Sequence, residues 1–188
     1  MAQLEYYNDI TRNLQPVEGS DGRMNVSARV DGRAAYNSRF QKQSYSFTYE
    51  HQVSVAGEYS FYIKNTSSDK TLVISSVGIN SDLGCRVKLW FATGDVTGGT
   101  AIVPANHNKS SSNDPAATML EHGNSTAIGG LDTPTERLDY VIIAPNGHEE
   151  LRLTDRVRLG QNDAILLEVD EVTSGTPDVF GVVFGYFE

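Results

Sequence analysis

The fold class can be read most directly from residues 138–188, LDYVIIAPNGHEELRLTDRVRLGQNDAILLEVDEVTSGTPDVFGVVFGYFE. Runs of alternating apolar and polar residues, separated by turn residues, predict strands at 138–144, 149–154, 156–159, 164–172 and 179–187. The apolar alternate positions are Leu151, Leu153, Val157, Leu159, Ile165, Leu167 and Val169. The positions between them include Arg152, Arg156, Arg158, Glu168 and Asp170. A period of two indicates strands with one face in a core and the other in water.

The same pattern extends back to residue 44. Aromatic and β-branched residues alternate with polar ones at 44–50 and 59–64, as is typical of a half-buried strand. Further strands are predicted at 71–80 and 85–93, and a short one near 118–120. Nine or ten strands about ten residues apart, with no helical pattern, predict an all-β antiparallel β-sandwich over residues 44–188, in the form of a jelly roll. The strand at 179–187 is apolar on both faces, so we expect the second sheet to cover one face and an arm or a neighbouring subunit the other.

Composition limits the classes of function. The chain has 188 residues, which is enough for one domain that buries roughly 70% of its unfolded surface. Its net charge of −9 argues against nucleic-acid binding. No apolar run of membrane-spanning length occurs, and the first residues predict no signal peptide. The single cysteine, Cys85, cannot form an intrachain disulfide, which fits a reducing compartment.

Residues 1–43 differ from the rest of the chain, with scattered apolar residues and many Gly, Asn, Ser and Gln. Residues 22–42 include five basic residues and one acidic residue, so this segment has a net charge of +4. The rest of the chain therefore has a net charge of −13. This composition predicts an extended N-terminal arm that lies on another molecule. An ordinary edge strand or a disordered leader is the alternative. The basic residues of the predicted arm are Arg23, Arg29, Arg33, Arg39 and Lys42.

Two aromatic residues are candidates for an interface. Trp90 falls on the face opposite the core positions of its strand, next to Lys88, and Tyr36 lies outside any clear core position. Exposed Trp and Tyr side chains are effective anchors in protein interfaces. The alternative for Trp90 is that it packs under the arm or under the long polar segment 104–137. That segment is either a crossover between the sheets or a recognition loop.

The sequence contains no recognisable catalytic or metal-binding pattern, so we expect no catalytic residue, no cofactor and no metal. The histidines (His51, His107, His122 and His148) form no pair at metal-ligand spacing. No Gly-x-Ser-x-Gly elbow or phosphate-binding glycine loop occurs. A buried Cys85 would be inert. The acidic residues that could form a glycosidase pair are Glu149, Glu150, Asp155, Asp163, Glu168 and Asp170.

Several phrases of the sequence carry a resemblance that begins in the predicted arm and extends to the last residue. They are DGRAAYNSR (31–39), FYIKNT (61–66), KLWFATG (88–94), RLGQNDA (158–164) and VFGYFE (183–188). Together they resemble small β-rich structural proteins of tailed bacteriophages. The resemblance implies a virion component that is not an enzyme. The expected role is a capsid decoration, or cement, protein.

Such a protein is made in the host cytoplasm and is found on the surface of the phage head. The resemblance implies that its partners are the major capsid protein and further copies of itself, as a homotrimer, without nucleic acid or membrane. The basic arm would then contact the shell. Two alternatives stay open at this point: a tail-associated adhesin that touches a host receptor through residues 104–137, and a carbohydrate-active enzyme built on a jelly roll.

Overall fold

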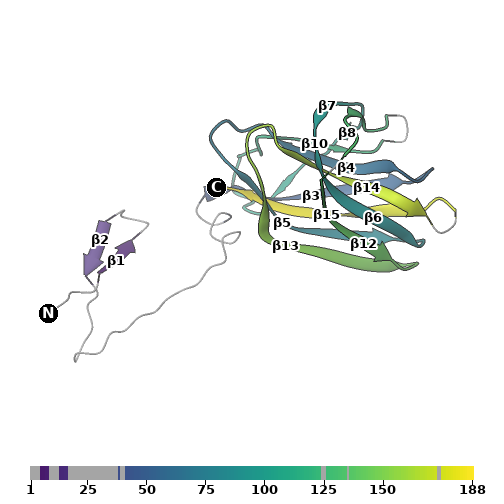
Figure 1. The fold of residues 1–188 in the computed structure, drawn as a ribbon. Helices are drawn as coiled ribbons and strands as arrows, with labels where there is room; N and C mark the ends of the chain where they lie inside the picture. Colours follow the sequence, from purple (N-terminus) through teal and green to yellow (C-terminus); the bar gives the residue numbers. More distant parts are fainter. Residues whose placement is uncertain are drawn as a thin grey trace. The chain divides into compact units, whose positions relative to one another are not determined.

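The computed structural model in Figure 1 describes residues 5–8, 13–16, 38, 41–123, 126–134, 136–172 and 175–188. The chain divides into two compact units, Met1–Asp31 and Gly32–Glu188. In the first unit, β1 (Glu5–Asn8) and β2 (Asn13–Pro16) pair antiparallel, with Glu5 opposite Pro16. This hairpin lies within the stretch for which the sequence predicts an arm. The second unit contains all the other strands.

The second unit is all β in its described residues. Its long strands are β3 (Ser44–Gln52), β4 (Glu58–Asn65), β5 (Leu72–Ser81), β6 (Cys85–Ala92), β12 (Arg137–Ile143), β13 (Gly147–Leu159), β14 (Ala164–Val172) and β15 (Asp178–Phe187). Its short strands are β7 (Gly94–Thr97), β8 (Thr100–Ala101), β9 (Ala105–Asn106), β10 (Ala117–Glu121) and β11 (Gly129–Leu131). The predicted short strand near 118–120 is confirmed as β10.

Two antiparallel sheets pack face to face, which confirms the predicted sandwich (Figure 1). One has the strand order β12-β6-β14-β4-β10-β8 and the other β13-β5-β15-β3-β9. Successive long strands alternate between the two sheets except at β6 and β12, which are neighbours in the six-stranded sheet. Their pairing is nested, because β3 pairs with β15, β4 with β14, β5 with β13 and β6 with β12. The first of the eight long strands therefore lies beside the last, and the fourth beside the fifth.

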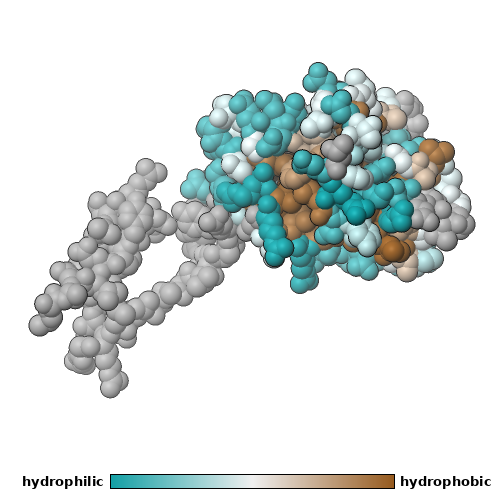
Figure 2. Space-filling model, in the orientation of Figure 1, coloured by the Kyte–Doolittle hydropathy of each residue, from teal (hydrophilic) through white to brown (hydrophobic). Residues whose placement is uncertain are grey.

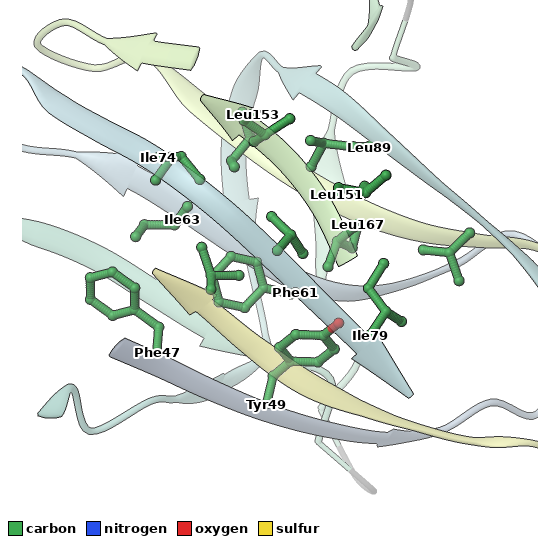
Figure 3. Packing of buried hydrophobic residues seen from close by; sticks show 14 of the residues in the cluster. Phe47, Tyr49, Phe61, Ile63, Ile74, Ile79, Leu89, Leu151, Leu153 and Leu167 are labelled. Carbon is green, nitrogen blue, oxygen red and sulfur yellow. The ribbon is translucent and has the colours of Figure 1, made fainter. Parts of the chain in front are cut away.

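The main core fills the space between the sheets. Figure 3 shows side chains of both sheets meeting there, among them Phe47, Phe61, Ile74, Leu89 and Leu167. All five are completely buried. Burial of each such side chain contributes about 1.5–3 kcal/mol relative to exposure. The alternating pattern of the sequence therefore identifies the core face correctly.

Residues 149–159 form one strand where the sequence predicts two. The pairing of β13 with β5 shifts between Arg152 and Val157, and Thr154 has a positive φ of 44°. A bulge of this kind bends a strand without ending it. The bulge includes the polar pair Thr154-Asp155, where the sequence pattern predicts a break between two strands.

A second, smaller core lies on the outer face of the six-stranded sheet. Tyr62 and Leu166 are buried there together with Ile128, and Leu131 packs against them. Ile128 and Leu131 belong to the long polar segment, which the sequence leaves open as a crossover or a recognition loop. Its strand β10 pairs with β4 and extends the sheet. Much of the segment is therefore part of the fold.

Candidate functional site

The predicted arm residues lie mostly outside the part of the chain that the structure describes. This applies to the candidate residues Arg23, Arg29, Arg33, Tyr36 and Arg39. Lys42 is described and is exposed, with a positive φ of 56°. Its main-chain carbonyl accepts a hydrogen bond of 2.9 Å from the side chain of Asn106 in β9. The backbone before β3 is thus fixed to an edge of the five-stranded sheet, while the Lys42 ammonium group can face solvent or a partner.

Trp90 lies on the outer face of the six-stranded sheet, as predicted, but it is only half exposed. Its indole nitrogen donates a 2.6 Å hydrogen bond to Glu168, and the ammonium group of Lys88 lies 5.6 Å from its ring. It packs against the smaller core that contains Ile128. The alternative interpretation, in which Trp90 packs under the long segment, therefore fits the structure better than a free interface anchor.

Four of the six acidic residues considered as a glycosidase pair have structural partners. Asp170 accepts hydrogen bonds from Arg86 and Lys88, and Glu168 accepts one from Trp90. Similarly, Glu150 pairs with Arg152, and Asp163 accepts a hydrogen bond from the amide of Gly160. These contacts explain the positions of the carboxylates without a catalytic role. Cys85 is buried, and burial raises the pKa of its thiol, as expected for an inert cysteine.

The outer face of the five-stranded sheet carries exposed aromatic side chains. Phe180 and Phe184 on β15 are 45% and 36% exposed, and Val103 nearby in the chain after β8 is 87% exposed. Phe180 and Val103 line an open hollow of about 730 Å³, together with Thr48 and Glu50 of β3. The sequence predicts that both faces of β15 are covered. Within the described residues, this outer face remains accessible.

Apolar side chains also gather on the side of the sandwich that Figure 2 displays. They form a patch that hydrophilic residues surround. Large exposed apolar patches are uncommon on monomeric proteins and mark contact surfaces.

Among the described residues, no helix is long and apolar enough to cross a membrane.

Three polar side chains converge at one end of the sandwich. His51 continues the inward-facing series of β3 that includes Phe47 and Tyr49, and it is 3% exposed. Glu58 opens β4 in the other sheet, and His122 follows β10 directly. One ligand atom from each of these three residues lies within 4.8 Å of the others. We call this group the His-Glu-His cluster.

The two imidazole rings of the cluster are stacked. Their centroids are 3.9 Å apart and their planes differ by 16°. Burial and the neighbouring His122 lower the pKa of His51 to about 4, although Glu58 acts in the opposite direction. At neutral pH the His51 ring is therefore uncharged. A hydrogen bond of 2.8 Å joins its Nδ1 to the hydroxyl of Ser60, which is also buried.

A polar pocket of about 490 Å³ opens beside the cluster. His122 lines it, together with three carboxylates on β3, β10 and β15: Glu50, Glu121 and Asp178. Oxygens of this kind attract cations from solvent. The pocket therefore gives the cluster both access to solvent and a negative surrounding.

Sequence reasoning misses this cluster because the histidines are far apart in the chain. One signal is present, since the alternation 45-47-49-51 places His51 at a core position. An imidazole at such a position requires polar partners. The position of His122 depends on the pairing of β10 with β4, which no local pattern reveals.

No protein-family model, curated protein or solved structure matches this chain in comparisons with known proteins.

Proposed function

We propose that this protein is a structural component of a tailed-phage virion and that it acts as a capsid decoration protein. The observation that carries the proposal is the division of the chain into a small N-terminal unit and a sandwich with its own core. In the sequence, the five basic residues of the predicted arm fall between residues 23 and 42, on either side of the unit boundary after Asp31. The resemblance of five sequence phrases to phage structural proteins supports the same role.

We further infer that the sandwich is a jelly roll. Eight long strands divide equally between two sheets, and their nested pairing places the first strand beside the last and the fourth beside the fifth. This arrangement is what results when a long antiparallel hairpin is rolled into two facing sheets, which is the jelly-roll plan. The fold by itself does not select a function.

Two surfaces would contact the shell. The basic arm would contribute electrostatic attraction, because the cationic groups between residues 22 and 42 would form ion pairs with carboxylates on an acidic capsid surface. The outer face of β15 supplies apolar anchors, since Phe180 and Phe184 are exposed on a rigid strand. Aromatic anchors surrounded by polar residues are typical of protein interfaces.

The mechanism would be thermodynamic. A protein that binds the assembled shell, but not the free subunits, stabilises the assembled state by mass action. A homotrimer would present three arms and three sandwich faces, so that individually weak contacts add to a high avidity. The partners are therefore the major capsid protein and two further copies of the chain, and the location is the outer surface of the head.

The two alternatives have less support from the described residues. An adhesin would use residues 104–137 as an exposed recognition loop, but this segment provides β10 to the sheet and Ile128 to a core. A carbohydrate-active enzyme would use a carboxylate pair, but most of the candidate carboxylates have structural partners. The decoration role requires neither feature.

Charge reversal in the full-length chain tests the proposal. A variant with Arg23, Arg29, Arg33 and Arg39 changed to Glu should lose co-sedimentation with purified mature shells. A control variant with four exposed sandwich residues changed to Glu (Lys109, Arg137, Arg152 and Arg156) alters the net charge equally and should still bind. Equal loss in both variants would indicate a nonspecific charge effect and would contradict the arm.

Location on the particle provides a second test. Immunogold electron microscopy of the parent phage, with antibody against this protein, should label the head surface. Label confined to the tail tip would favour the adhesin. An unlabelled particle would exclude the virion role and direct attention back to enzymatic activity.

A further inference from the structure

The buried imidazole of His51 has one nitrogen without a hydrogen bond. Its Nδ1 contacts the hydroxyl of Ser60, but its Nε2 has no hydrogen-bond partner among the described residues. This Nε2 lies 3.2 Å from Oε2 of Glu58 and forms an ion pair with it only when the ring is protonated. A buried polar atom that lacks a partner is costly, so its retention calls for an explanation.

His122 presents its own Nε2 in a defined tautomer. Its Nδ1 lies 3.1 Å from the main-chain carbonyl oxygen of Tyr59. A carbonyl oxygen only accepts hydrogen bonds, so Nδ1 carries the proton and Nε2 of the neutral ring holds a lone pair. Metal-binding histidines are oriented in this way, with the second nitrogen donating to a carbonyl.

The carboxylate of Glu58 also accepts hydrogen bonds from Ser54. The main-chain amide of Ser54 donates to Oε2 at 2.7 Å, and the Ser54 hydroxyl donates to Oε1 at 2.5 Å. The two bonds fix the orientation of the carboxylate beside the imidazole of His51. Each carboxylate oxygen has two lone pairs, so Oε2 can still bind a metal ion while it accepts the hydrogen bond from Ser54.

We propose that His51, Glu58 and His122 form a binding site for a divalent transition-metal ion of the Zn²⁺ type. Zinc bonds to nitrogen and oxygen of about 2.0–2.2 Å in a tetrahedral shell place neighbouring ligand atoms roughly 3.3 Å apart. The 3.2 Å between Nε2 of His51 and Oε2 of Glu58 matches this spacing, whereas the stacked ring of His122 must turn for its Nε2 to reach the same ion. A bound cation would also supply the partner that the Nε2 of His51 lacks.

The ligand set selects the class of metal. Two imidazole nitrogens and one carboxylate suit Zn²⁺ and its neighbours in the transition series, whereas Ca²⁺ and Mg²⁺ prefer shells made only of oxygen. The fourth position would face the pocket lined by Glu50, Glu121 and Asp178. A water molecule is the expected fourth ligand.

The position of the site suggests its role. His51 belongs to β3 of the five-stranded sheet, whereas Glu58 and His122 belong to β4 and to the end of β10 in the six-stranded sheet. One ion would therefore join the two sheets at this end of the sandwich. Binding to the folded state alone stabilises that state, so the metal would serve as a structural cross-link.

The test uses full-length protein dialysed against a chelator and then titrated with Zn²⁺. We expect one equivalent to bind and the Tm to rise by about 5–10 °C at a hundredfold excess over Kd. Co²⁺ at the same site should show the visible absorption of a tetrahedral complex. A Tm and a Co²⁺ spectrum that do not respond to excess metal would overturn the proposal.

Variants locate the site. Glu58→Gln and His122→Gln alter partly exposed residues, and each should weaken Zn²⁺ binding by more than about 100-fold. His148→Gln is the matched control, because His148 lies on β13 and bonds to Asn80 away from the cluster. Zn²⁺ binding that survives in both cluster variants, or that is lost in the control, would place the metal elsewhere and overturn the assignment.

Discussion

The side-chain amide of Asn65 donates a hydrogen bond of 2.8 Å to the main-chain carbonyl of Leu159, and this bond joins the two sheets. Asn65 ends β4 in one sheet, and Leu159 ends β13 in the other. The same amide donates to the carbonyl of Lys70, and the side-chain oxygen accepts from the amide of Ser67. Asn65 is completely buried, and its bonds to Leu159 and Ser67 are buried with it.

Replacement of Asn65 by Ala should therefore be costly. The change would leave the carbonyls of Leu159 and Lys70 and the amide of Ser67 without their partner, and each such group that is buried costs about 1–3 kcal/mol. We expect the free energy of unfolding to fall by about 2–4 kcal/mol, measured by urea denaturation. Asn113→Ala, at an exposed position, is the control and should change it by less than about 0.5 kcal/mol. Equal effects of the two substitutions would refute the cross-sheet role.

Gly181 tests the close approach of β15 to β5. A Cβ atom at this position would lie 2.0 Å from the carbonyl oxygen of Gly78 and 2.7 Å from the hydroxyl of Tyr49. Gly181→Ala should therefore lower the urea midpoint by the equivalent of about 1–3 kcal/mol or more. In Gly129→Ala the nearest atom to the new Cβ is 3.5 Å away, so that variant should keep the wild-type midpoint. A neutral Gly181→Ala would mean that the strands can separate locally.

The fold could largely be predicted from the sequence because burial in a sandwich is a local pattern. Every second residue of β14 faces the core, so the spacing of Ile165, Leu167 and Val169 is enough to identify that face. The boundaries within 149–159 were less predictable. A polar pair can mark either a turn or a bulge, and the choice depends on whether the partner strand β5 continues past it.

The His-Glu-His cluster could not be predicted in this way. Its members meet because β3 and β4 belong to different sheets and β10 joins β4 after a long polar segment. The second core has the same origin, since Ile128 reaches Tyr62 only when that segment folds onto the sheet. Long-range pairing, which carries no local signal, decides both features.

The ion pairs of Asp170 predict a dependence of stability on pH. Hydrogen bonds from Lys88 and Arg86 hold the pKa of Asp170 below its ordinary value, although burial opposes them. A pKa lowered by folding gives stability that is present above the unfolded pKa, near 3.9, and is lost as the pH falls through the folded pKa. Wild type should therefore be more stable than Asp170→Asn at neutral pH, and the difference should shrink below about pH 4. A difference that stays constant in acid, in urea titrations at stepwise pH, would contradict this origin.

Replacement of Phe61, on the inner face of the six-stranded sheet, should destabilise the protein more than replacement of Phe180, on the outer face of the five-stranded sheet. Phe61 is completely buried in the main core, so Phe61→Ala should lower the free energy of unfolding by about 3–5 kcal/mol. Phe180 is 45% exposed, and Phe180→Ala should lower it by less than about 1 kcal/mol. Thermal or urea unfolding followed through Trp90, the single tryptophan, measures both. Comparable losses would mean that the outer face of β15 is covered in the free protein.

If the outer face of β15 docks on the shell, Phe180 and Phe184 should be required for binding to the shell but not for the stability of the free protein. We expect the double variant Phe180→Ala, Phe184→Ala to fold and to bind mature shells at least about tenfold more weakly, since a buried aromatic anchor contributes more than about 1 kcal/mol. Ile142→Ala is the control, because Ile142 is also exposed but lies on β12 of the other sheet. Quantitative co-sedimentation with shells measures all three proteins. Unchanged binding by the double variant would leave the basic arm as the sole contact, whereas an equal loss with Ile142→Ala would move the docking surface to the six-stranded sheet.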